Sequence, residues 1–102
     1  MGRRKINVYI VHKIRYSNSV KFEWDTKKND ELRDEGRPTF DDVVLVLESG
    51  EFQIIPNDAH PEQQRYLVFM DEYPHIVPFE DRGDVRRLIT VFPDRRYKEF
   101  KL

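Results

Sequence analysis

Arginine is the residue type whose placement in this chain most strongly suggests chemistry. The last six arginines fall in or beside segments predicted to be strands, and they are Arg65, Arg82, Arg86, Arg87, Arg95 and Arg96. A guanidinium group presents its donors as a planar fork that fits phosphate oxygens. Such donors stabilise the extra negative charge that a phosphate gains when a hydroxyl group attacks it. The cluster therefore predicts a phosphate-handling site, and the alternative is a set of ion pairs with the acids of the chain.

Charges are segregated along the sequence, although they almost cancel in total. Residues 1–21 hold six basic and no acidic groups, residues 22–81 hold sixteen acidic and five basic groups, and residues 82–102 hold seven basic and three acidic groups. If the two basic ends are neighbours in one sheet, they form a positive face suited to phosphates. The alternative is that the acidic middle neutralises them as an ordinary solvated surface.

Other kinds of site have less support in the sequence. There is no cysteine, so disulfides, thiolate metal ligands and a cysteine nucleophile are excluded. The three histidines, His12, His60 and His75, lie on separate predicted elements without the spacing of metal ligands. Histidine side chains titrate near neutral pH, which makes His60 a candidate proton carrier, with a solvated loop residue as the alternative.

Length and composition indicate one folded domain of the α+β class. The chain has 102 residues, of which 38% are hydrophobic and 13% are aromatic, and aromatic side chains bury a large area each. No apolar run approaches the roughly 18 residues of a membrane-spanning helix. The basic and apolar N-terminus lacks a signal-peptide cleavage site. We therefore expect a soluble, cytoplasmic protein with no membrane partner.

Two strands and two helices are predicted in the first half of the chain. Residues 5–14 and 20–24 favour antiparallel strands joined by the turn at residues 17–19. A helix over residues 27–35 follows its N-cap Asp25 and ends at Gly36. A second helix follows the N-cap Thr39, which pairs with Asp42 in an approximate capping box. Its buried stripe is predicted to be Phe40, Val43, Val44 and Leu47.

The second half of the chain predicts strands. A short strand over residues 51–56 and a polar loop over residues 57–64 lead to a meander over residues 65–70, 75–79 and 85–92. Period-two alternation points Arg86 and Arg87 to opposite faces of the last strand. Pro78 lacks a backbone donor, so its strand is predicted to lie at an edge or to be locally bulged. After Pro93 there is room for only one or two helical turns.

The order of several short motifs resembles the BrnT family. These motifs are, in chain order, Phe22-Glu23-Trp24-Asp25, Lys28-Asn29, Leu32, Gly36, Phe40 with two acids after it, His60, Arg65-Tyr66 and Arg82-Gly83-Asp84. The resemblance covers residues 20–92 of a single BrnT-like domain spanning residues 1–102. Residues 1–19 are expected to form an extended N-terminal strand and turn, and residues 93–102 a short tail.

The BrnT family consists of small ribonuclease toxins of type II toxin–antitoxin pairs with a RelE-like fold. The resemblance implies an antiparallel sheet of about five to six strands with two short helices packed on one face. It also implies metal-independent RNA cleavage, without a cofactor, through attack of a 2′-hydroxyl. The expected protein partner is an antitoxin, usually a ribbon-helix-helix protein, and the chain would contact DNA only through this antitoxin.

Residue roles follow from the same resemblance. Arg65 and Arg87 are expected to contact or stabilise phosphate, and His60 or Glu35 to act as general acid or base. Residues expected to bind RNA are Trp24, Arg82, Arg86, Arg95, Arg96 and Tyr97, with Trp24 or Tyr97 stacking on a base. The alternative place for Trp24 is the core.

Two positions depart from the family pattern. Glu35 stands where the family often has histidine, and Phe92 stands where an arginine is expected, a gap that Arg95 or Arg96 could fill. These departures favour an alternative function, a catalytically inactive BrnT-like module that acts through a protein partner. A further alternative is a nucleic-acid-binding domain without cleavage, for which the basic ends of the sequence, with net charges of +6 and +4, would be sufficient.

Overall fold

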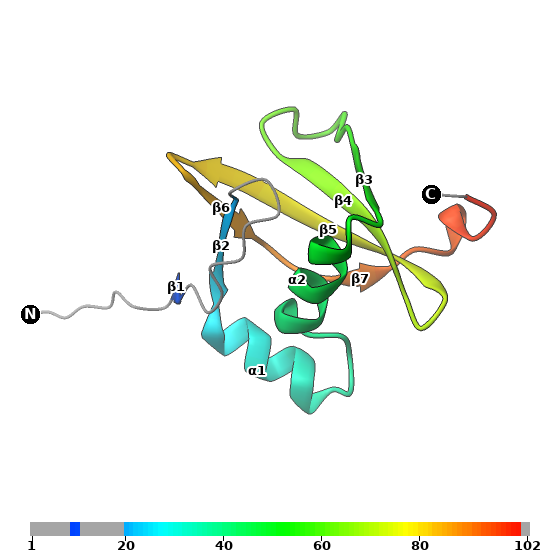
Figure 1. Ribbon diagram of the computed structural model, residues 1–102, viewed down its shortest axis with the longest axis horizontal. Coiled ribbons are helices and arrows are strands. Elements are labelled where there is room, and N and C mark those ends of the chain that lie inside the picture. The colour runs from blue at the N-terminus through cyan, green and yellow to red at the C-terminus, as the bar shows by residue number, and fades with distance from the viewer. Residues whose placement is uncertain (1–8, 11–19, 101–102) are drawn as a thin grey trace, which may run out of the picture.

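The computed structural model describes residues 9–10 and 20–100, which form a sheet with two helices on one face (Figure 1). Its elements are β1 (Tyr9–Ile10), β2 (Lys21–Asp25), α1 (Thr26–Asp34), α2 (Phe40–Ser49), β3 (Phe52–Ile55), β4 (Gln64–Met70), β5 (Tyr73–Arg82), β6 (Val85–Leu88), β7 (Phe92–Pro93) and the 3₁₀ helix η3 (Arg95–Tyr97). The predicted α+β class is confirmed. The remaining predictions for residues 1–19, including His12, lie outside the described residues.

Helix α1 begins and ends where its local signals predict. The Asp25 side chain accepts hydrogen bonds from the backbone N–H groups of Lys27 and Lys28, as an N-cap does. Gly36 has a φ of 71°, the left-handed conformation that commonly follows a helix. Asn29 is buried and joins α1 to α2, because its amide oxygen accepts from the Phe40 N–H. A mostly polar helix is thus held by its two ends and by one buried amide.

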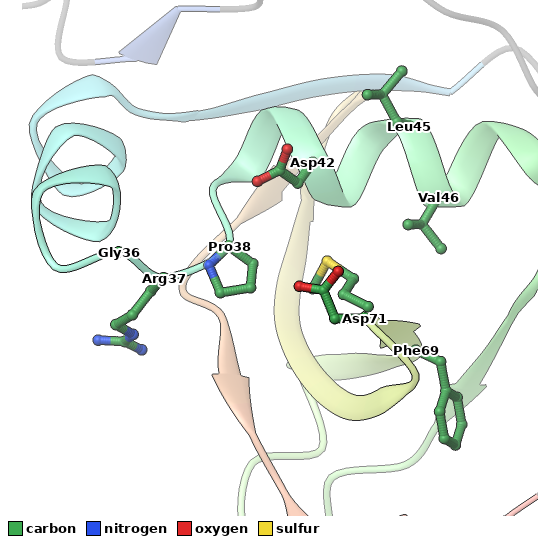
Figure 2. Close-up of a pocket in the computed structure, with 9 residues that line it drawn as sticks. Gly36, Arg37, Pro38, Asp42, Leu45, Val46, Phe69 and Asp71 are labelled. Carbon is green, nitrogen blue, oxygen red and sulfur yellow. The ribbon is translucent and has the colours of Figure 1, made fainter.

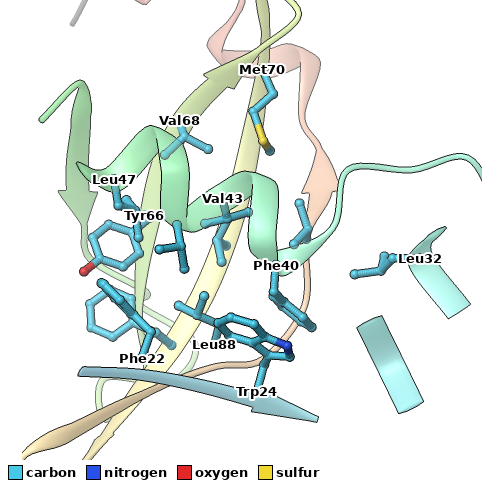
Figure 3. Close-up of a cluster of buried hydrophobic side chains, with 14 residues drawn as sticks. Phe22, Trp24, Leu32, Phe40, Val43, Leu47, Tyr66, Val68, Met70 and Leu88 are labelled. Carbon is cyan, nitrogen blue, oxygen red and sulfur yellow. The ribbon is translucent and has the colours of Figure 1, made fainter. Parts of the chain in front are cut away.

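Helix α2 has the predicted capping box and the predicted buried stripe. Thr39 and Asp42 exchange hydrogen bonds between side chain and backbone at the helix start. The buried residues of the helix are Phe40, Val43, Val44 and Leu47. This stripe packs on the sheet, mainly against aromatic and aliphatic side chains of β2, β4, β5 and β6 (Figure 3).

The strand order of the sheet is β1-β2-β6-β5-β4-β3, with β7 paired to β5 beside this path. All pairs are antiparallel except β2 and β6, which run parallel. The sheet is therefore mixed, which corrects the prediction of an antiparallel sheet at this one pair. No hairpin joins these two strands, since both helices and three strands lie between them, so no tight turn imposes an antiparallel direction.

Strand β5 crosses the interior of the sheet, so of the two alternatives predicted for Pro78 the edge strand is excluded. The partner strand is interrupted instead, because the predicted strand over residues 85–92 consists of β6 and β7 with a break between them. The Pro78 carbonyl accepts from the Ile89 N–H at 2.9 Å within this break. The proline nitrogen faces the same side and has no hydrogen to donate, so a regular ladder cannot continue past it.

The core between the helices and the sheet is centred on aromatic rings. Trp24 is fully buried and stacks on Phe40, with ring centroids 5.8 Å apart and an interplanar angle of 27° (Figure 3). Tyr66 packs against Phe79 with a centroid distance of 4.5 Å. Among the described residues, no helix is long and apolar enough to cross a bilayer.

Candidate functional site

Cross-strand pairing assigns the strand residues to two faces of the sheet. Directly paired residues project to the same face, and neighbours along a strand project to opposite faces. Tyr66 pairs with Val77, and both belong to the cluster under the helices. Their neighbours Arg65 and Pro78 also pair with each other, so Arg65 projects to the opposite face. We call the face that points away from the two helices the open face.

Arg87 and Arg82 lie on the open face together with Arg65. Arg87 pairs with Glu80, whereas the adjacent pair, Phe79 and Leu88, belongs to the helix-side cluster. Alternation along β5 places Arg82 on the same face as Glu80. Strand β5 separates β4 from β6, so Arg65 and Arg87 stand on strands about 10 Å apart. Both side chains are long enough to approach a ligand that lies over β5.

Glu80 sits among these arginines on the open face, near the end of β5. Its carboxylate accepts hydrogen bonds from Gln63 Nε2 at 3.1 Å and from the Arg82 guanidinium at 3.2 Å. These bonds, the one from Gln63 first, lower the pKa of Glu80, and Arg87 adds attraction. A carboxylate with a lowered pKa is ionised at neutral pH and accepts a proton poorly. Glu80 therefore offsets part of the positive charge of the face.

The loop that carries His60 borders the open face. It connects β3 to β4, and the Pro56 carbonyl at its start accepts from the Arg65 guanidinium at 2.5 Å. Gln63 at its end donates to Glu80, so both ends of the loop are tied to residues of the face. The His60 side chain is exposed and lies 3.6 Å from the Glu62 carboxylate. The loop is thus anchored at the site while its histidine remains in solvent.

Trp24 does not offer a base-stacking surface, which corrects one of the expected RNA contacts. Its exposed fraction is 0%, and it projects to the helix side of β2 against Phe40. A base would have to replace this packing to reach the indole ring. The alternative interpretation, a core tryptophan, is the one that the structure supports.

Arg86, which was also expected to bind RNA, is part of the packed structure on the helix side. Its guanidinium donates to both Asp81 oxygens at 2.6 and 2.9 Å and to the Tyr66 hydroxyl at 2.8 Å. It also lies 4.2 Å from the centre of the Phe79 ring, and only 19% of its side chain is exposed. The bonds to Asp81 raise the pKa of Arg86, and burial raises the pKa of Tyr66. These contacts already use the guanidinium donors of Arg86 that an RNA phosphate would need.

Glu35 is not brought to the open-face arginines. It is the C-cap of α1, exposed, and its carboxylate pairs with the Arg37 guanidinium at 2.9 Å. Since α1 packs on the helix side, Glu35 lies in the layer opposite Arg65 and Arg87. Its expected role as an acid or base beside these arginines has no geometric support.

The C-terminal residues form a second basic group, at the other end of β5 from Arg82, and Arg65 lies close enough to this group to help lower the pKa of Asp94. Asp94 caps η3, is 8% exposed, and accepts from the Arg96 guanidinium at 2.6 Å. The hydrogen bonds from Arg96 lower the pKa of Asp94. Arg95 is exposed, and Tyr97 is half-buried, with its ring in a T-shaped contact with the Phe100 ring. The Asp94 N–H donates to the Pro74 carbonyl, which fixes this group far along β5 from Arg82.

The C-terminal segment also limits how much of the open face a ligand can reach. Leu67 and Ile76 project to the open face by their pairing, yet both are fully buried. Strand β7 pairs with β5 at Ile76, and η3 contacts β5 again. Within the described part of the chain, the area of the face left for a ligand is therefore the end with Arg65, Arg82 and Arg87.

Sequence reasoning did not single out Glu80 or Gln63. Alternation with Arg82 was a usable signal for Glu80, because it places the two residues on one face. The contact from Gln63 depends on the path of the loop, so no local pattern reveals it. Among the described residues, no group of three or more His, Asp or Glu side chains gathers as a metal site.

No protein-family model, curated protein or solved structure matches this chain. The resemblance to the BrnT family thus rests on the order of motifs in the sequence. What the chain does has to be inferred from that order and from the geometry of the open face.

Proposed function

We propose that this chain is a BrnT-like ribonuclease toxin that acts in the cytoplasm and binds RNA on the open face. One observation carries the proposal. Arg65 and Arg87, which the resemblance assigns to phosphate, share with Arg82 the one sheet face that the helices leave uncovered. A phosphate over β5 would face guanidinium groups from two sides, which is the arrangement that phosphate recognition favours.

The proposed reaction is an internal transfer of the phosphate. The 2′-oxygen forms a bond to phosphorus, the bond from phosphorus to the 5′-oxygen breaks, and the products are a 2′,3′-cyclic phosphate and a 5′-hydroxyl. The 2′-hydroxyl loses a proton and the 5′-oxygen gains one, so no co-reactant is required. Arg65 and Arg87 would stabilise the pentacoordinate phosphate, an effect worth about 10²- to 10³-fold in rate for one well-placed donor.

His60 is the better of the two expected proton carriers. Its loop is tied to Arg65 through Pro56, so movement of an exposed side chain could bring it to the phosphate. Glu35 lies in the opposite layer, beside Arg37. Glu80 is closer to the arginines, but its lowered pKa makes it a weak base.

The test is RNA cleavage by the purified chain in the presence of a chelator. Arg65→Ala and Arg87→Ala should each reduce the rate by about 10²- to 10³-fold. Arg33→Ala is the matched control, because Arg33 is an exposed arginine of α1 paired with Asp30. Equal rates for wild type and the two open-face variants would contradict the proposal.

A second function, RNA binding without cleavage, is favoured by the position of Glu35 and the exposure of His60. It predicts no cleavage but retained binding whose affinity falls steeply with salt, as phosphate contacts require. Absence of both cleavage and binding would favour the inactive module that acts through a protein partner.

The toxin proposal includes a ribbon-helix-helix antitoxin that neutralises the protein and binds DNA. A small gene for such a protein directly beside this one is the expected genetic arrangement. Expression of this chain alone should inhibit growth, and co-expression of the antitoxin should relieve that inhibition. Arg65→Ala should relieve it as well. Growth inhibition that persists in Arg65→Ala would not come from the proposed reaction.

A further inference from the structure

Arginines are spaced along the whole length of β5 on the open face. Arg82 ends the strand, beside Arg87 on β6. Arg65 pairs with Pro78, and the residue that precedes η3 is hydrogen-bonded to the Pro74 carbonyl. Pro78 is midway between Pro74 and Arg82, so at about 3.4 Å per residue these positions lie about 13 Å apart and span about 26 Å. The basic side chains therefore follow one strand from end to end.

The arginines of η3 continue this line. Arg95 is exposed, and the Arg96 side chain is 72% exposed although Asp94 accepts hydrogen bonds from its Nε and Nη2. The bonds from Arg96 lower the pKa of Asp94, and the charge of Arg65 adds to this effect. Arg65 thus lies near the η3 arginines as well as on the strand next to Arg82. The two basic groups are neighbours along one path.

The carboxylates beside this path are less accessible than the arginines. Arg87 pairs across the strands with Glu23 and Glu80, and Asp94 lies at the other end. The Glu80 and Asp94 side chains are 31% and 8% exposed, whereas the Arg82 side chain is 52% exposed. A ligand on the open face therefore meets mainly guanidinium groups, which favours an anion.

The tip of the β4–β5 hairpin limits the path at the Pro74 end. Asp71 and Glu72 form this tip and are both exposed. Their negative charges repel phosphate. An anionic strand that reaches Pro74 is therefore directed over η3 and not over the tip.

An aromatic hollow lies beside the same end of the path. Its volume is about 390 Å³, and its lining includes the rings of Phe52, Phe69 and Phe100. Phe69 projects from β4 away from α2 (Figure 2), and it pairs with Pro74. Phe100 follows η3 and is 37% exposed. Exposed rings next to arginines are typical of sites for single-stranded nucleic acid, because unpaired bases stack on them.

Double-stranded RNA fits these features poorly. Its bases are paired and stacked, so they cannot enter the hollow. The transfer proposed above also requires the 2′-oxygen in line with the departing 5′-oxygen, an alignment that a regular A-form helix does not give. A flexible single strand meets both requirements.

We propose that the substrate is single-stranded RNA that lies lengthwise along β5, with phosphates on Arg82 and Arg87, on Arg65 and on η3, and with an unpaired base in the hollow beside Phe100. The inference rests on the proposed function and adds the form and the minimum length of the RNA. Sites of this kind cover about four nucleotides or more.

The length of the path is tested by fluorescence anisotropy with 2′-O-methyl RNA, which lacks the attacking hydroxyl and stays intact. Affinity should rise about tenfold between strands of about two and about six nucleotides, and little beyond about ten, because the added nucleotides reach η3. A duplex that contains the longest strand should bind about tenfold more weakly than that strand alone at the same salt concentration.

The η3 end of the path is tested by Arg95→Ala and Phe100→Ala. Each should weaken the strand of about six nucleotides by about three- to tenfold, and the shortest strand much less. The matched controls are Arg33→Ala, an exposed arginine on α1, and Ile54→Ala, an exposed apolar residue on the helix side of β3. Both should change affinity less than about twofold. Thermal melting establishes that each variant is folded, and Phe100→Leu replaces Phe100→Ala if the latter unfolds.

Three results would overturn the inference. They are equal affinity for the duplex, no gain in affinity beyond two nucleotides, and losses in Arg95→Ala and Phe100→Ala no larger than in their controls. Cleavage that still required Arg65 and Arg87 would in that case leave the proposed function intact. Conversely, affinity that rises with length in the absence of cleavage supports the path of the strand and contradicts the proposed reaction.

Discussion

Arg86 and Arg87 are adjacent in the sequence and belong to different parts of the molecule. Arg86 projects to the helix side, where it binds Asp81 and Tyr66 and covers the Phe79 ring. Arg87 projects to the open face, where it pairs across the strands with Glu80. The same side chain is thus part of the packed structure at one position and part of a candidate ligand surface at the next. The arginine cluster predicted from the sequence therefore contains two groups. Only the fold shows which arginines lie on the helix side of the sheet and which on the open face.

The two faces also differ in what surrounds their charges. On the helix side, Tyr66 is packed among Phe22, Phe52 and Phe79, and the charges of Arg86 and Asp81 compensate each other. On the open face, the guanidinium groups of Arg65, Arg82 and Arg87 lie with two carboxylates, because Arg87 pairs across the strands with both Glu80 and Glu23. Substitutions on the helix side should therefore lower the free energy of unfolding, and substitutions on the open face should change the affinity for RNA.

Trp24→Ala should have the largest effect on the helix side. Removal of a fully buried tryptophan from a core costs about 3–5 kcal/mol, which is a large part of the stability of a small domain. Urea unfolding followed by circular dichroism measures this loss. Trp24→Phe should retain much of the packing against Phe40 and should leave RNA affinity unchanged.

A folded Trp24→Phe variant that no longer bound RNA would contradict the assignment of Trp24 to the core. Such a result would mean that the indole contacts RNA in a conformation other than this one. A loss of binding that accompanies unfolding would not count against the core position.

Arg86→Leu and Arg87→Leu should separate the two faces most directly. Arg86→Leu leaves the Tyr66 hydroxyl and Asp81 without their donor, and we expect a loss of about 2 kcal/mol, reduced from the buried-pair value because Asp81 is 54% exposed. Arg87→Leu should cost less, about 1 kcal/mol, because Arg87 is only half-buried and lies outside the hydrophobic core. Arg87→Leu should weaken RNA binding more than Arg86→Leu does. Equal stability losses would contradict the assignment of faces.

Local chemistry made much of this fold predictable. Asp25, Thr39 and Gly36 set the ends of the helices through bonds within a few residues, and all three act as predicted. Alternation also places Arg86 and Arg87 on opposite faces without any knowledge of the fold. The sequence could not show which of the two faces the helices cover, because that depends on the parallel pairing of β2 with β6.

Long-range contacts explain the remaining differences. The break between β6 and β7 follows from Pro78 on another strand, whereas residues 85–92 alone favour one continuous strand. The role of Glu80 depends on Gln63 and Arg82, of which Gln63 comes from a loop. The sequence predicted the residue types of the candidate site. Which of these residues lie together depends on the face of the sheet to which each one projects.

Asp94→Asn should have a moderate effect, confined to the C-terminal end of β5. Asparagine keeps the cap of η3 but loses the charged pairing with Arg96, and we expect a loss of about 1 kcal/mol near neutral pH. The pKa of Asp94 is lowered in the folded state, so its contribution is present above the unfolded pKa and is lost as the pH falls through the folded pKa.

Wild type and Asp94→Asn should therefore approach equal stability as the pH falls below about 4. Thermal melts at several pH values measure this convergence. A difference that stayed constant down to about pH 2 would mean that capping geometry and not charge provides the effect. Cleavage should be reduced much less than by Arg65→Ala if η3 lies outside the reactive part of the face.

Glu80→Gln should have the smallest effect and the opposite sign. It removes a negative charge that Gln63 and Arg82 hold beside Arg87, so the open face becomes more positive and RNA affinity should rise about two- to fivefold at low salt. Glu72→Gln is the matched control, because it changes the same charge at the hairpin tip and should alter affinity less. Filter binding or fluorescence anisotropy with a short RNA measures the change. Weaker binding by Glu80→Gln would mean that Glu80 accepts a hydrogen bond from RNA, and a loss of cleavage with unchanged binding would make Glu80, and not His60, the proton carrier.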